Sequence, residues 1–115
     1  MTENLEKSFE LASSLMAISN QKRILFEEYD QSLLYFYNGG TFKIDKDLIS
    51  FLNVLKSYNN HSCVLIDANK LPIEIEDIST FLTTILDQYI RCSNHYLAEY
   101  QKIKNNKNLE SILDL

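Results

Sequence analysis

Apolar residues near the start of the chain recur at intervals of three and four, at Leu5, Phe9, Ala12, Leu15, Met16 and Ser19. This spacing places them on one side of an α-helix. Glu3, Glu6 and Glu10 add negative charge at the helix start, where the helix dipole favours it. Between Arg23 and Tyr29 the pattern fits either a continued helix or a strand, because apolar residues there satisfy both periods.

The middle of the sequence predicts two β-hairpins. Asn38-Gly39 separates two apolar and aromatic runs, and this dipeptide supplies the positive φ angles of a tight primed turn. The second hairpin joins Cys63–Ile66 to Leu71–Glu76 through a turn of Asp, Ala, Asn and Lys. Pro72 donates no backbone hydrogen bond, which predicts that its strand lies at a sheet edge.

Each of the two remaining helices begins with an aspartate. Asp45 caps a short helix whose apolar face runs from Leu48 to Leu55, and Asp77 caps a long helix that continues to Lys104. The long helix exceeds what short strands can cover, so its second half is expected to project or to pack on another protomer.

These elements predict an α+β fold, with an antiparallel sheet of two β-hairpins at about 33–44 and 63–76. An N-terminal helix, a short middle helix and a long C-terminal helix complete it. We expect a single domain over residues 1–104, followed by a polar linker and an acidic, hydrophobic tail over residues 105–115.

Charge and composition narrow the possible functions. The 115 residues carry a formal net charge of −5 with only two arginines, Arg23 and Arg91, which disfavours a nucleic-acid-binding protein. The sequence shows no secretory signal and no apolar run that would span a membrane. Two cysteines are too few for a disulfide framework, so a soluble, cytoplasmic protein is expected.

Two histidines and two cysteines are the candidate chemical groups. His61, Cys63, Cys92 and His95 have the atoms that bind zinc, and a Cys with a His can form a nucleophilic pair. Their spacing matches no usual zinc motif, and no orienting group accompanies them. We therefore expect structural residues here, with no metal, cofactor, small-molecule substrate or enzymatic activity.

Interaction surfaces are expected in three places. They are the strand at Leu71 and Ile73, the far half of the long helix at Tyr96 and Tyr100, and the tail at Ile112, Leu113 and Leu115. The predicted partner is another protein or a second copy of the chain. The alternative is an RNA-binding module in which Tyr35 and Tyr37 of the first hairpin stack on bases.

Three stretches carry a family resemblance: residues 20–25, 37–43 and 64–67, together with the acidic, Leu-rich ending. They resemble small uncharacterised accessory proteins of marine tailed (myovirus-type) phages. The resemblance implies an accessory or assembly role, in the host cytoplasm, and assigns no functional residue. The N-terminal helix and Asn-Gly turn are also similar to the Sm-like RNA-binding fold, although the middle helix and long last helix depart from it.

Overall fold

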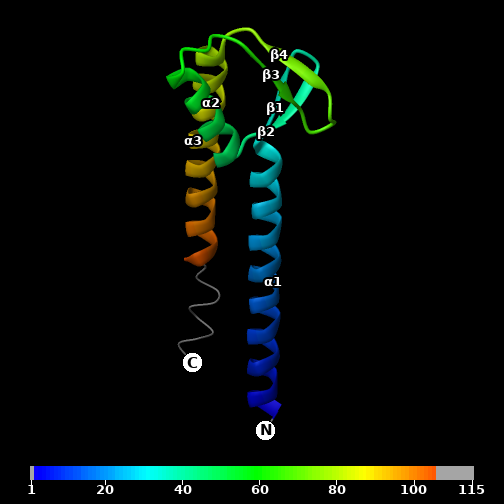
Figure 1. Cartoon of the computed structure of the whole chain (residues 1–115). Coiled ribbons are helices and arrows are strands. Elements are labelled where there is room, and N and C mark those ends of the chain that lie inside the picture. The colour runs from blue at the N-terminus through cyan, green and yellow to red at the C-terminus, as the bar shows by residue number, and fades with distance from the viewer. Residues whose placement is uncertain (1, 106–115) are drawn as a thin grey trace. The chain divides into compact units, whose positions relative to one another are not determined.

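The computed structural model describes residues 2–105 and confirms the α+β fold class (Figure 1). Three helices and four strands follow one another in the order α1-β1-β2-α2-β3-β4-α3. Their bounds are α1 Thr2–Ser32, β1 Leu34–Tyr37, β2 Gly40–Lys43, α2 Lys46–Ser57, β3 Cys63–Ile66, β4 Pro72–Ile75 and α3 Ile78–Lys104.

The segment left open by the sequence is helical, because residues 23–29 continue α1 without a break. At 31 residues α1 is longer than α3, which has 27. The chain divides into two compact units. One unit combines α1 up to Tyr29 with α3 from Asn94 onward, and the other consists of Asp30–Ser93.

Both predicted hairpins lie in the unit Asp30–Ser93, as two separate antiparallel two-stranded sheets. In the first, Tyr37 pairs with Gly40 across the turn, where Asn38 and Gly39 have φ angles of 50° and 82°. These angles are the ones that a primed turn demands. The Asn-Gly dipeptide therefore does what the sequence predicts.

The two hairpins are joined through Asp67 instead of through a continuous ladder. Its side-chain Oδ2 accepts a hydrogen bond from the Thr41 backbone N–H of β2 at 2.8 Å, and the Thr41 carbonyl accepts one from the Ala68 N–H at 2.9 Å. The other oxygen, Oδ1, accepts bonds from the backbone N–H groups of Asn69 and Leu71, at 2.9 and 2.8 Å. One buried carboxylate thus closes its own turn and holds the neighbouring hairpin.

Gly40 allows the hairpins to approach closely. A Cβ atom at this position would lie 2.6 Å from Cγ1 of Ile73, which is nearer than carbon atoms can pack. Ile73 fills the space over the glycine and is 8% exposed. With Ile73 in place, the first residue of β2 therefore has to lack a side chain.

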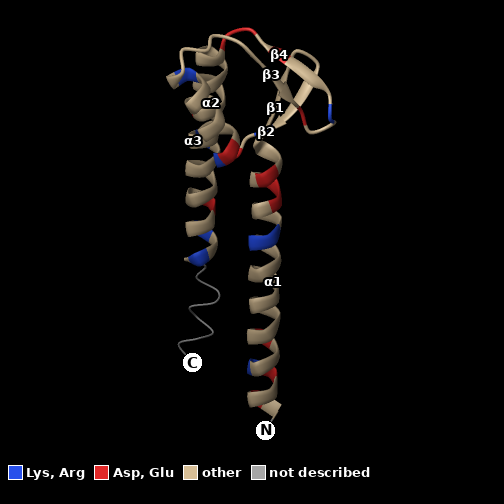
Figure 2. Cartoon of the chain, viewed as in Figure 1, with Lys and Arg blue, Asp and Glu red and all other residues tan. Residues whose placement is uncertain are grey.

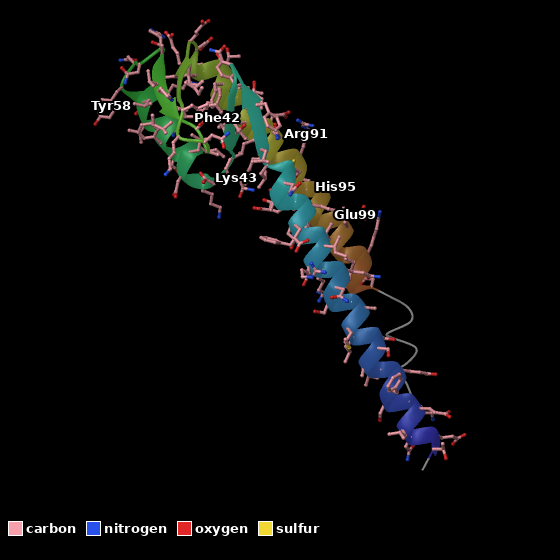
Figure 3. All side chains as sticks on the ribbon, turned by 90° about the vertical axis from the view of Figure 1, so that its right-hand side faces the viewer. Phe42, Lys43, Tyr58, Arg91, His95 and Glu99 are labelled. Carbon is pink, nitrogen blue, oxygen red and sulfur yellow. The ribbon has the colours of Figure 1, made fainter. Side chains whose placement is uncertain are left out.

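The hydrophobic core of this unit lies where the inner hairpin faces meet α2 and the first half of α3. Phe81 of α3 makes edge-to-face contacts with three rings. They are those of Tyr35, Tyr37 and Phe42, with centroid distances of 5.5, 5.2 and 5.4 Å. Figure 3 labels Phe42 among the side chains of this unit. Further buried residues are Ile44, Leu52, Ile75, Ile78 and Ile85.

The helix ends find their hydrogen-bond partners as expected. The Asp45 carboxylate accepts from the Leu48 N–H at 2.7 Å, and Asp77 accepts from Ser79 and Thr80 at the start of α3. Both aspartates are therefore the predicted caps. The last turn of α1 has no basic residue of its own. Its Ser32 carbonyl instead accepts from the Gln88 side-chain amide of α3 at 2.8 Å.

Replacing Asp67 by Asn should separate the roles of its two carboxylate oxygens, which together accept three hydrogen bonds. The Asn carbonyl can still accept from Asn69 and Leu71, whereas its NH2 group would face the Thr41 N–H, donor against donor. We expect hydrogen exchange to accelerate at the Thr41 amide and much less at the turn amides. Equal acceleration at all three amides would contradict separate roles for the two oxygens.

The same substitution has a pH signature. Hydrogen bonds from Thr41 and Leu71 lower the pKa of Asp67, so its stabilising effect is full above the unfolded pKa of about 3.9. The effect is lost as the pH falls through the lower folded pKa. The difference in unfolding free energy between wild type and Asp67→Asn should therefore shrink below about pH 4. Glu74→Gln, at an exposed position of β4, serves as the control in denaturant titrations.

Phe81→Ala should destabilise the fold by about 3–5 kcal/mol, because it leaves a cavity among three rings. Phe51→Ala removes the same side chain from a half-exposed position on α2 and should cost much less. Urea unfolding followed by circular dichroism compares the two variants. Similar losses would show that the rings around Phe81 do not form the core.

Candidate interaction surface

One face of α1 packs against the second half of α3, and the two helices run antiparallel there. Tyr29 stacks on Tyr96 with ring centroids 4.7 Å apart, and the Lys22 ammonium lies 5.2 Å from the centre of the Tyr100 ring. Ile18 and Leu25 are buried on the same side of α1. The two tyrosines predicted as interaction residues, Tyr96 and Tyr100, are half-buried and line this helix pair.

A second apolar face of α1 is exposed. Leu5, Phe9 and Met16 are 72%, 75% and 68% exposed, and Ala12 lies between them in the same row. We call these four residues the α1 stripe. At 100° per residue the stripe lies about 160° around the helix from the face that carries Ile18 and Leu25. Apolar side chains of this size that stay exposed in one row over residues 2–105 are typical of a binding surface.

Charge is absent from the middle of α1. No Lys, Arg, Asp or Glu occurs over residues 11–21, and this part of the helix is tan in Figure 2. Acidic residues gather before it, at Glu3, Glu6 and Glu10, while Arg23 follows it and pairs with Glu27 at 2.9 Å. The α1 stripe therefore runs from an acidic end toward a basic residue.

The second hairpin presents a different set of residues from the predicted one. Leu71 is half-exposed, whereas Ile73 points into the core opposite Leu65. The outer face carries Val64 and Ile66, which are both exposed. The predicted tail residues Ile112, Leu113 and Leu115 lie outside the described residues.

The tyrosines of the RNA alternative, Tyr35 and Tyr37, are half-buried and turn their rings toward Phe81. Their contacts are those of core aromatic residues. The exposed aromatic residue of β1 is Phe36.

Of the candidate chemical groups, His61 and Cys63 lie just before and at the start of β3, whereas Cys92 and His95 both lie on α3. Over residues 2–105, no three His, Cys, Asp or Glu side chains lie close enough together to hold a metal ion. Both cysteines are free thiols, and burial raises the pKa of the Cys63 thiol, which keeps it protonated and weakly nucleophilic. The Cys92 thiol points to the Ser32 carbonyl at 3.5 Å.

His95 projects from α3 near Glu99 (Figure 3). The pKa of Glu99 is lowered mainly by a hydrogen bond from Lys102, with smaller contributions from the Lys102 and His95 charges. These charged groups form a cluster on the surface of α3, as is typical of the solvent-exposed side of a helix.

In the described part of the chain, no helix is both long and apolar enough to cross a membrane.

The sequence spacing places the α1 stripe on one side of the helix and does not indicate whether that side is covered. The buried face is marked by a separate signal, because Leu11, Ile18 and Leu25 recur at intervals of seven residues. A helix with two apolar rows has two neighbours to contact. Counting both rows would have predicted that one of them needs a partner outside this helix pair.

No family model matches the chain, and neither a curated protein nor a solved structure matches it.

Proposed function

We propose that the chain is a non-enzymatic protein–protein interaction module that assembles with copies of itself. The observation that carries the proposal is the exposed α1 stripe, with Leu5, Phe9 and Met16 each more than two-thirds exposed. Covering such side chains is the main favourable term in protein association.

The electrostatics favour a protein partner over a nucleic acid. The net charge is −5, and the helix that carries the α1 stripe has three acidic residues in its first ten against one lysine. A phosphate backbone would be repelled from this surface. The half-buried positions of Tyr35 and Tyr37 also leave the RNA alternative without an exposed stacking platform on these residues.

The two free thiols are compatible with a reducing compartment, so the proposed setting is the cytoplasm. The resemblance to phage accessory proteins would make it the cytoplasm of an infected host and the role one of assembly. The proposal itself depends on the α1 stripe and is independent of this setting.

Self-association should be lost when the α1 stripe is made polar. In Phe9→Lys/Met16→Lys, two exposed apolar side chains are replaced while helix propensity is kept. Sedimentation equilibrium from micromolar to submillimolar concentration should show a mass above 13.4 kDa for wild type and the monomer mass for the variant.

Ala17→Lys/Gln21→Lys is the matched control. It adds the same two charges to exposed positions of α1 outside the α1 stripe and should associate as wild type does. A wild-type chain that stays monomeric over the whole concentration range would overturn the proposed function.

A further inference from the structure

We propose that two copies of the chain associate through an antiparallel pairing of their α1 stripes. In this pairing Leu5 of one copy lies opposite Met16 of the other, and Phe9 lies opposite Ala12. The inference rests on the proposed function and names its partner, which is a second copy of the same helix.

The spacing of the stripe is that of a helix-pairing seam. Leu5, Phe9, Ala12 and Met16 are separated by four, three and four residues, the interval between the core positions of a coiled coil. Ser19 continues the row, and Arg23 ends it with a charge. The apolar contact is therefore limited to residues 5–16, and its midpoint lies between Glu10 and Leu11.

Side-chain size selects the antiparallel direction. Turning one stripe around this midpoint places the large Phe9 against the small Ala12 twice, and Leu5 against Met16 twice. A parallel pair would instead place Phe9 against Phe9 and Ala12 against Ala12. One layer would then be overfilled and the next would hold a void, and both defects are destabilising.

Charge selects the same direction. Each helix starts with Glu3, Glu6 and Glu10 against the single Lys7. A parallel pair would bring both acidic ends together and align the two helix dipoles. In the antiparallel pair the two acidic ends lie at opposite ends of the contact, and Arg23 of each copy, whose side chain is more than half exposed, lies about 8 Å along the axis beyond Glu3 of the other copy.

The two faces of α1 make the pairing compatible with the existing α1–α3 contact. Because the faces are about 160° apart at 100° per residue, α1 can keep Tyr29 on Tyr96 of α3 while its stripe contacts the second copy. Each α1 then has two helical neighbours, which lie on nearly opposite faces of the helix.

The area predicts a weak dimer. A fully covered aromatic side chain buries about 150–250 Å². The four stripe residues therefore supply on the order of 400–500 Å² per copy, near the lower end of specific interfaces. We expect a dimer that dissociates on dilution through the micromolar range.

Crosslinking between single cysteines tests the direction. In a Cys63→Ala/Cys92→Ala background, one preparation carries Leu5→Cys and another carries Met16→Cys, and folding of each is checked by circular dichroism. The short crosslinker bismaleimidoethane should join the two variants when they are mixed. It should not join two copies of Leu5→Cys, whose cysteines would be about 16 Å apart along the helix axis. Leu5→Cys mixed with Gln21→Cys is the control for random collision.

Each outcome bears on a different statement. A sedimenting dimer in which Leu5→Cys crosslinks to itself is parallel, and it overturns this inference while the proposed function stands. A dimer with neither crosslink uses another surface and overturns the inference in the same way. A chain that is monomeric throughout overturns the inference and the proposed function together.

Discussion

The unit Asp30–Ser93 depends on one carboxylate, that of Asp67. Two hairpins of four-residue strands have little stability alone, because an isolated two-stranded sheet is marginal in water. Asp67 joins them by accepting bonds from Thr41 and from its own turn at once. Burial of this side chain is tolerated because its charge is met by three backbone N–H groups. The inner faces of both hairpins are thereby held over the rings around Phe81.

Features that depend on neighbouring residues were predictable from the sequence. The Asn38-Gly39 turn and the caps at Asp45 and Asp77 follow from what one or two residues do to the nearby backbone. The helical periodicity of α3 was equally clear. The choice between helix and strand for residues 23–29 could not be made from the sequence, because both patterns fit locally. In the structure these residues are helical, and Leu25 among them is buried.

Features that depend on distant residues were missed. Asp67 was read as a turn former, and nothing in its neighbours indicates the bond to Thr41, 26 residues away. The α1 stripe was found by its spacing, but its exposure was not, because the contacts of α1 with α3 lie at Lys22, Phe26 and Tyr29, further along the helix. Ile73 was expected at an accessible edge and is instead buried over Gly40. In each case the deciding contact joins elements that are far apart in the sequence.

The bare backbone at Gly40 couples two positions that are 33 residues apart. Because an added methyl would overlap Cγ1 of Ile73, a bulkier residue at 40 becomes tolerable when position 73 shrinks in compensation. Random mutagenesis followed by selection for folded protein would therefore recover changes at these positions as a pair. The tip of one hairpin and the middle of the other behave as a single steric unit under mutation.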